Sequence, residues 1–280
     1  MRAAVVGHVE WVDFLIVGAL PQAGEIDHAR AAYEAPGGGG AMGAYALRAL
    51  TGACAFYTAI GDDDRGRRTL DALRAAGLDV HATVRRGVPQ RRVVTYLAGE
   101  QGERAITVLG ERLVPLGADD LPWASLGHYD AVYLTAGDAA VARAARAAPL
   151  LVATARAREP IVEAGVHVDV LIGSAGDPGE AIDEALVAAA RPRHVVLTEG
   201  GAGGSWRSAD GRRGRWDATP PPAAPVDAYG CGDAFAAALT AALAAGHGID
   251  AACRLAAPIG AAVLCERAPA VGDLARLWAA

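Results

Sequence analysis

Short apolar segments rich in valine, leucine and isoleucine recur along this chain and alternate with segments of helical periodicity. The expected strands are residues 3–6, 131–134, 150–152, 168–172 and 194–198. Strands that are apolar throughout are typical of a sheet buried on both faces, and the helices that connect parallel strands cover those faces. The alternation therefore predicts an α/β fold in which a mostly parallel sheet lies between two layers of helices. At 280 residues, the chain is long enough to form one such domain over residues 1–280.

Two regions do not follow this alternation. Residues 11–17, and later residues 92–97 and 105–109, have the pattern of strands, and the last two are joined across residues 99–102. We therefore expect a small antiparallel layer apart from the main sheet, with strands drawn from about residues 9–20 and 90–110. Such a layer could cover a cleft.

The clearest expected helix spans residues 65–76. Three aspartates at positions 62–64 supply an N-cap and favourable charge at the positive end of the helix dipole, and Gly77 ends the helix. Leu70 and Leu73 form its apolar stripe. We interpret this segment as structural.

The basic residues narrow the possible chemistry. All 26 are arginines, and the chain contains no lysine and no asparagine. A Walker-A loop, a protein-kinase β3 site, a Schiff-base enzyme and a pyridoxal-phosphate enzyme each need a lysine, so these four kinds of site are excluded. The formal net charge of −6 and the scattered arginine pairs argue against a nucleic-acid partner, which requires a clustered basic face.

The cysteines and the hydropathy pattern bear on the cellular compartment. The four cysteines show no CxxC spacing and lie in alanine-rich segments, which argues against a disulfide framework or a structural zinc site. No stretch reaches about 18 apolar residues without a charge or a helix breaker, so neither a signal peptide nor a membrane span is expected. We predict a cytoplasmic protein with no membrane partner.

The glycine-rich segment PVDAYGCGDAF, residues 225–235, leads into a nearly pure alanine helix over residues 236–245. A glycine loop that opens a helix presents unpaired backbone N–H groups and the positive end of the dipole, which together bind phosphate without a lysine. The carboxylate of Asp233 would repel phosphate there, unless it accepts a proton from a nucleophile that attacks the phosphate. Two interpretations of Asp233 stay open, a catalytic base and a helix N-cap.

Two other glycine-rich segments are compatible with ligand binding but do not require it. PGGGGAMG, residues 36–43, begins a helix that runs to about Leu50, and TEGGAGG, residues 198–204, follows an expected strand at its carboxyl end. Open α/β sheets bind ligands at that edge. Residues 198–204 lead to another expected strand and not to a helix, so they do not form a dinucleotide-binding fingerprint.

The order of these segments is similar to that of the ribokinase-like, or PfkB, family of carbohydrate and nucleoside kinases, and the likeness spans essentially the whole chain. The most specific part is the C-terminal segment, because the family's D-T-x-G-A-G-D-x-F appears here as D-A-Y-G-C-G-D-A-F from Asp227 to Phe235. The resemblance implies a three-layer α/β/α core with a small β lid. It also implies phosphorylation of a hydroxyl group on a small sugar or sugar-like molecule, with ATP and Mg²⁺ as cofactors.

The resemblance assigns phosphoryl transfer to the C-terminal segment. Asp233 would be the general base that deprotonates the acceptor hydroxyl. The anion hole for the transferred phosphoryl group would be formed by the backbone amides of Gly230, Cys231 and Gly232.

Binding roles are implied for residues in the other segments. Asp13, in the first lid strand, matches the family aspartate that hydrogen-bonds sugar hydroxyls. The remaining positions beside the acceptor are Gly37, Gly38 and Met42, and the positions that match the nucleotide loop are Thr198, Gly200 and Gly203. Asp227 matches a residue near the monovalent-cation site of many members, so a monovalent cation is a further implied partner.

Four positions modify what the resemblance implies. Met42 replaces the asparagine of the family's G-G-K-G-A-N, so recognition of a ribose-type acceptor is not expected. Asp177 ends S-A-G-D where the family has N-x-x-E, and the shorter side chains predict weaker magnesium binding or a water in the gap. Ala268-Pro269 replaces the G-A that the family usually has near the end of its last helix, so activation by a monovalent cation is not assumed. Arg156 has two interpretations, an arginine near the phosphates and a surface residue.

Alternatives to a sugar kinase stay open on the sequence. A nucleoside acceptor could stack on Trp11, Phe14 and Tyr96, although lid aromatics also pack as ordinary core. A non-catalytic ligand-binding protein of the same fold would explain the altered motifs, but the intact Asp233 and its glycine loop speak against it. A homodimer is possible, and His8 is either a turn residue or a group that faces the acceptor.

Overall fold

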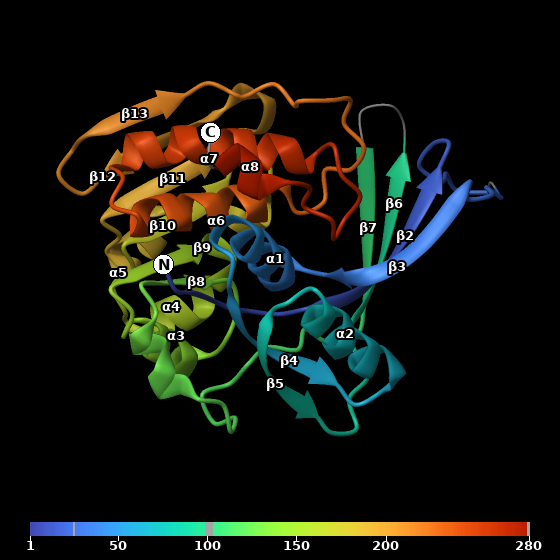
Figure 1. Cartoon of the computed structure of the whole chain (residues 1–280), viewed down its shortest axis with the longest axis horizontal. Coiled ribbons are helices and arrows are strands. Elements are labelled where there is room, and N and C mark those ends of the chain that lie inside the picture. Colours follow the sequence, from blue (N-terminus) through green and yellow to red (C-terminus); the bar gives the residue numbers. More distant parts are fainter. Residues whose placement is uncertain (25, 99–102, 279–280) are drawn as a thin grey trace.

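The computed structural model describes residues 1–24, 26–98 and 103–278. A nine-stranded sheet forms the centre, with the strand order β13-β12-β11-β10-β9-β8-β1-β4-β5 (Figure 1). Its strands are β1 (Ala3–Val6), β4 (Ala55–Gly61), β5 (Asp79–Arg85), β8 (Ala131–Leu134), β9 (Leu150–Thr154), β10 (Val170–Ser174), β11 (His194–Thr198), β12 (Gly204–Ser208) and β13 (Arg213–Trp216). The strands from β5 to β11 are parallel, and β12 and β13 extend the edge in the antiparallel direction.

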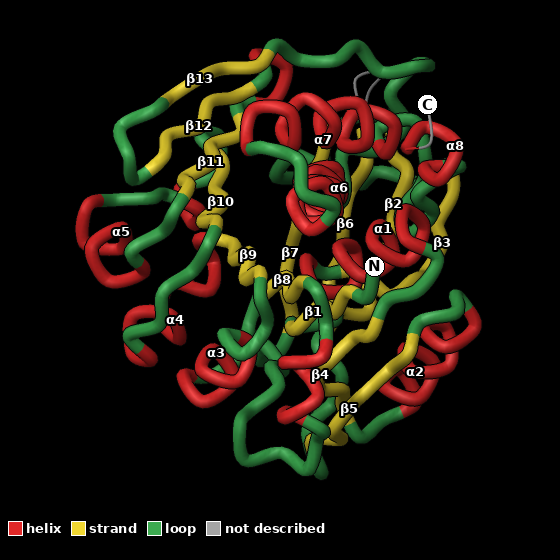
Figure 2. The backbone as a smooth tube through the Cα atoms, turned by 60° about the vertical axis from the view of Figure 1, so that its left-hand side comes forward, coloured by secondary structure: helices red, strands yellow, loops and turns green. Residues whose placement is uncertain are grey.

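Helices cover both faces of this sheet. They are α1 (Gly39–Thr51), α2 (Asp64–Ala75), α3 (Ala139–Ala145), α4 (Arg158–Ala164), α5 (Glu184–Ala190), α6 (Cys231–Ala244), α7 (Ile249–Val263) and α8 (Leu274–Trp278). Short 3-10 turns occur at η1 (Trp123–His128), η2 (Ala155–Ala157), η3 (Pro178–Glu180) and η4 (Gly200–Ala202). In Figure 2, α1, α2, α6 and α7 lie on one face of the sheet and α3, α4 and α5 lie on the other. The expected α/β fold with two helical layers is confirmed.

The central strands are apolar throughout because each face of the sheet has its own core. In β1, Val5 belongs to the core beneath α1 and α6, whereas the next residue, Val6, belongs to the core beneath α3 and α4. Side chains alternate across a strand, so both positions are buried and both are apolar. The same reason explains why these strands could be recognised from the sequence.

The order in which successive strands join the main sheet reverses beside β1. From β1 the chain proceeds outward through β4 and β5 on one side, and from β8 it proceeds through β9 to β11 on the other. Open α/β sheets bind ligands at such a reversal, beyond the carboxyl ends of the strands. The functional site is therefore expected beyond the carboxyl ends of β1 and β8.

A separate small sheet has the order β3-β2-β6-β7, with the strands β2 (Glu10–Val17), β3 (Ala31–Gly37), β6 (Arg92–Ala98) and β7 (Glu103–Leu109). It stands apart from the main sheet in Figure 1. The expected layer is present, but it is not wholly antiparallel, because β2 and β6 pair in parallel. Strand β3 was not expected, since its sequence AAYEAPG contains no β-branched residue. The expected connection at residues 99–102 lies outside the described residues.

Two helices begin near their expected positions. In α2 the side chain of Asp63 accepts a hydrogen bond from the Gly66 amide at 2.9 Å, so the expected aspartate cap is confirmed. Helix α6 starts at Cys231, five residues before the expected start. Across the described ranges, no helix combines the length and the apolar character that a membrane crossing needs.

Candidate active site

The first turn of α6 provides a group of backbone donors. Gly230 is the N-cap residue, in the left-handed conformation with φ 79°, and no side chain caps the helix. The first N–H groups of an uncapped helix are unpaired and carry the positive end of the dipole, so they can bind an anion. A Cβ at Gly230 would lie 2.5 Å from Cε of Met42, so packing also requires glycine there.

Met42 packs against the glycine loop at Gly230. Its side chain is fully buried in the core and packs against Gly230. The structure therefore places Met42 under the anion-binding loop, with no surface exposed to a ligand. The prediction that it contacts the acceptor has no support in this geometry.

Asp233 lies in the first turn of α6 and faces the beginning of α1. A Cβ at Gly39, the first residue of α1, would lie 2.9 Å from Oδ1 of Asp233. Helix α1 is also uncapped by any side chain, so the N-termini of two helices meet at one carboxylate. Gly230 and not Asp233 is the N-cap of α6, which decides against the capping interpretation.

The surroundings of Asp233 favour its protonated form. Burial and the charge of Glu180 raise the pKa of this carboxyl and Arg156 opposes them, and the resulting pKa is about 7. Within the described residues, the carboxylate accepts no hydrogen bond that would hold it in the ionised state. A carboxyl group with a pKa near 7 can accept a proton and release it under physiological conditions.

Gly37 and Gly38 let β3 pass close to Tyr229. The Gly38 amide donates a hydrogen bond to the Tyr229 hydroxyl at 2.7 Å, and a Cβ at Gly37 would lie 2.6 Å from that oxygen. Gly38 has φ 87°, which other residues rarely adopt. Burial raises the pKa of Tyr229, so its hydroxyl stays neutral. Tyr229 was not predicted as a site residue, because it occupies the variable position of the D-A-Y-G segment.

The register of β2 separates two acidic residues. Glu10 pairs with Gly37 and Asp13 pairs with Glu34, so the pleat turns these two side chains to opposite faces of the small sheet. Glu10 is buried beside Gly38, where a Cβ would lie 3.2 Å from Cγ of Glu10. On the other face, Asp13 accepts hydrogen bonds from Arg92 at 2.9 and 2.6 Å.

This register also separates the aromatic residues of the small sheet. Phe14 shares the face of Glu10 and makes an edge contact with Tyr229, with ring centroids 5.2 Å apart. Trp11 and Tyr96 lie on the face of Asp13, and the guanidinium of Arg68 sits 4.3 Å from the Trp11 ring. The aromatic residues expected to stack on a nucleoside are therefore divided between two faces.

Several charged residues gather at the carboxyl ends of β10 and β11. Ser174 and Thr198 are paired at the ends of these strands, and η3 follows β10. Arg156 donates from Nε to Glu180 at 2.8 Å and forms a second ion pair with Asp177. Arg156 is thus placed by two carboxylates and also acts on the charge of Asp233.

The other predicted nucleotide residues lie at the same edge of the sheet. The Thr198 hydroxyl donates to the Gly173 carbonyl at 3.3 Å, and Gly200 begins η4 with φ 57°. Gly203 has φ 84°, and a Cβ there would lie 2.1 Å from the Trp216 carbonyl. Thr198, Gly200 and Gly203 therefore form one compact turn after β11.

Asp227 holds the start of the α6 loop. It is fully buried and accepts hydrogen bonds from the amides of Tyr229 at 2.8 Å and Ala268 at 3.3 Å. Burial raises its pKa. Both oxygens are occupied by backbone amides, and Arg104 of β7 donates to the adjacent Ala228 carbonyl. Each carboxylate oxygen accepts one of these hydrogen bonds and keeps further acceptor capacity, so a role for Asp227 near a monovalent cation stays a prediction.

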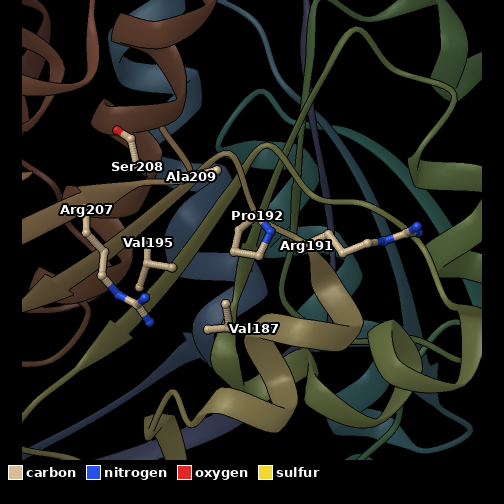
Figure 3. Close-up of a pocket in the computed structure, with 7 residues that line it drawn as sticks. All are labelled: Val187, Arg191, Pro192, Val195, Arg207, Ser208 and Ala209. Carbon is tan, nitrogen blue, oxygen red and sulfur yellow. The ribbon is translucent and has the colours of Figure 1, made fainter. Parts of the chain in front are cut away.

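Figure 3 shows a pocket that lies elsewhere. It is lined by Val187, Arg191, Pro192, Val195, Arg207, Ser208 and Ala209. These residues surround the beginning of β11 and the end of β12, which is the edge of the sheet opposite to Thr198. The pocket therefore does not belong to the group around Asp233.

The chain matches, over residues 2–273, the sequence family described as pfkB family carbohydrate kinase. No curated protein matches it by sequence. Similar solved structures include a ribokinase from Giardia lamblia, with a TM-score of 0.81 and 17% identity over 100% of this chain and 98% of that one.

Two further structures are similar in fold. The Arabidopsis thaliana ribokinase complexed with ribose and ATP has a TM-score of 0.75 and 20% identity over 99% of this chain and 98% of its own. Phosphofructokinase-2 from Escherichia coli in complex with fructose-6-phosphate has a TM-score of 0.73 and 15% identity over 99% of this chain and 97% of its own. Because the sequence family covers nearly the whole length, this chain belongs to the pfkB family of carbohydrate kinases.

Proposed function

We propose that this carbohydrate kinase transfers the γ-phosphoryl group of ATP to a hydroxyl group of a small sugar, with Asp233 as the general base. The observation that carries the proposal is the position of Asp233, whose carboxyl group lies where the uncapped N-termini of α1 and α6 meet. Its pKa of about 7 suits proton transfer at neutral pH.

The transfer needs one base and one anion site. The acceptor O–H gives its proton to Asp233 while its oxygen bonds to the γ-phosphorus and the bond from that phosphorus to the β-phosphate oxygen of ADP breaks. The amides of Gly230, Cys231 and Gly232 would stabilise the negative charge on the transferred group, because they lie at the positive end of α6, which no side chain caps. Most of the rate enhancement comes from positioning and this fixed electrostatic field.

The nucleotide would bind along the carboxyl ends of β10 and β11. Thr198, Gly200 and Gly203 line that edge, and the plant ribokinase of similar fold holds ATP. Asp177 and Glu180, both paired with Arg156 in this structure, are the carboxylates at this edge that would hold Mg²⁺ together with the nucleotide phosphates. Bound Mg²⁺ would neutralise phosphate charge. No role is proposed for a monovalent cation at Asp227.

The acceptor would lie between the main sheet and the small sheet. Glu10 and the backbone of Gly37 and Gly38 are the groups best placed to orient a hydroxyl beside Asp233. The predicted role of Asp13 finds no support in its geometry, because its side chain lies on the opposite face of the small sheet from Glu10 and Gly38. The division of the aromatic residues between two faces likewise disfavours a stacked nucleoside.

The small sheet would act as a lid. Arg104 reaches from β7 to the Ala228 carbonyl of the α6 loop, so the sheet and the anion site are already in contact. Closure over the acceptor would exclude water and suppress the hydrolysis of ATP.

The proposal also covers the cellular compartment and the oligomeric state. The four cysteines are free, which supports a reducing cytoplasm. Ile106 and Val108, which share one face of β7, are each exposed by 45%, an apolar pair that supports a homodimer through the small sheet.

The direct test is a screen for acceptor-dependent ADP release over pentoses, hexoses, sugar acids, sugar phosphates and nucleosides. We expect at least one sugar to stimulate release, and Asp233→Asn to lower kcat by roughly 10²- to 10⁴-fold. Asp71→Asn, which changes an exposed carboxylate on α2, is the matched control. Near-normal turnover of Asp233→Asn would refute the assignment, and a screen with no active acceptor would refute kinase activity.

A further inference from the structure

The carboxyl ends of β1 and β8 hold a charged group that the proposed mechanism does not use. His8 follows β1 and is buried, and its Nδ1 lies 2.9 Å from Nη2 of Arg112. The same Nη2 also donates to the Thr135 carbonyl, just beyond β8, at 3.4 Å. Arg112 therefore lies where the strand order of the main sheet reverses, at the carboxyl ends of β1 and β8. Open α/β sheets bind ligands at this place.

The protonation state of His8 follows from its partner. A guanidinium can only donate, so Nδ1 of His8 must be the acceptor and the imidazole is neutral. Burial lowers the pKa of His8, and the charges of Arg112 and Arg91 lower it further. A neutral His8 adds no charge and fixes the direction of the Arg112 guanidinium.

Arg112 differs from the other arginines around the site. Arg91, Arg92 and Arg156 have carboxylate oxygens at 2.9, 2.6 and 2.8 Å, from Glu10, Asp13 and Glu180 respectively. Within residues 1–24, 26–98 and 103–278, no carboxylate lies within ion-pair distance of Arg112. Arg112 is exposed, so the N–H groups of its guanidinium that do not contact His8 or Thr135 are accessible to a ligand.

This cation is close to the expected acceptor. A Cβ at Gly38 would lie 3.1 Å from the His8 ring. A Cβ at the next residue, Gly39, would lie 2.9 Å from Oδ1 of Asp233. The nucleotide edge at β10 and β11 lies two strands away, beyond β9. An anion on Arg112 would therefore belong to the acceptor and not to ATP.

We propose that the sugar acceptor carries an anionic group, either a carboxylate or a phosphate, and that Arg112, held by His8, binds this group. The inference rests on the proposed function and narrows its substrate class to sugar acids or sugar phosphates. Guanidinium groups recognise both anions through paired N–H donors, so the test has an arm for each.

The experiment compares matched acceptors at saturating Mg-ATP: glucose with gluconate and glucose 6-phosphate, and ribose with ribonate and ribose 5-phosphate. We expect an anionic member to exceed its neutral partner in kcat/KM by at least about 10-fold, since a charged hydrogen bond contributes about 1.5–3 kcal/mol. Arg112→Gln should raise KM for that anion by roughly 10- to 100-fold and change kcat by less than about threefold.

Arg143→Gln, an exposed arginine on α3, is the matched control and should leave both constants unchanged. A neutral sugar as the best acceptor, or an unchanged KM for the anion in Arg112→Gln, would overturn the inference while the kinase assignment stands. A thermal-shift titration with the same six compounds decides the inference without turnover. Stabilisation by an anion that disappears in Arg112→Gln supports it, and equal shifts in the two proteins overturn it.

Discussion

The environment of Asp233 predicts that this residue destabilises the folded protein at neutral pH. Its pKa is raised from 3.8 in water to about 7 by burial. Because the native state holds a proton that the unfolded state releases, stability falls as pH rises from about 4 to 7 and stays low above that range. At about 1.4 kcal/mol per unit, the free-energy cost is roughly 4 kcal/mol at pH 8 and about 1.6 kcal/mol at pH 5.

Asp233→Asn removes the charge and keeps the shape, so it should recover this cost. We expect urea unfolding to show the variant more stable than the wild type by about 2–4 kcal/mol at pH 8, with a gap at pH 5 that is less than half as large. The same variant should lose phosphotransfer, which separates function from stability. Asp71→Asn is the control and should give the same gap at both pH values. An Asp233→Asn protein no more stable than the wild type at pH 8 would refute the reasoning.

Three further predictions concern the reaction. For the wild type, kcat/KM should fall about tenfold per unit well below pH 7, because protonated Asp233 cannot accept a proton; a profile that stays flat down to pH 5 would contradict this. Gly39→Ala should leave the fold intact but lower kcat by roughly 10- to 100-fold, since its Cβ displaces Asp233 Oδ1, and circular dichroism with steady-state kinetics would check both. Glu10→Gln should raise the KM of the acceptor by about tenfold, whereas Asp13→Asn should stay within about twofold of the wild type, and the reverse order would show that Asp13 binds the acceptor.

The fold class and the α6 loop were predictable from the sequence because their signals are local. A strand buried on both faces is apolar at every position, as Val5 and Val6 show, and a run of aspartates before an apolar stripe predicts the start of α2. The D-A-Y-G-C-G-D segment likewise carries its own geometry, since glycine at position 230 and an uncapped helix expose the amides whatever surrounds them.

The site itself depended on contacts between distant segments. The face on which Glu10 and Asp13 lie follows from the pairing of β2 with β3, and a shift of one residue would exchange them. Strand β3 carries little local β signal, since Tyr33 is its one residue of high strand propensity, and it pairs along the edge of β2. Its register therefore could not be predicted from the order of residues.

The amino-acid sequence by itself determined the layers, the glycine loop and the presence of a carboxyl group at position 233, because propensity, capping and periodicity act over a few neighbouring residues. Only the tertiary structure decided the pKa of Asp233, the burial of Met42 and the partnership of His8 with Arg112. Desolvation and charge pairing depend on which groups approach through space, and His8 and Arg112 lie 104 positions apart in the chain.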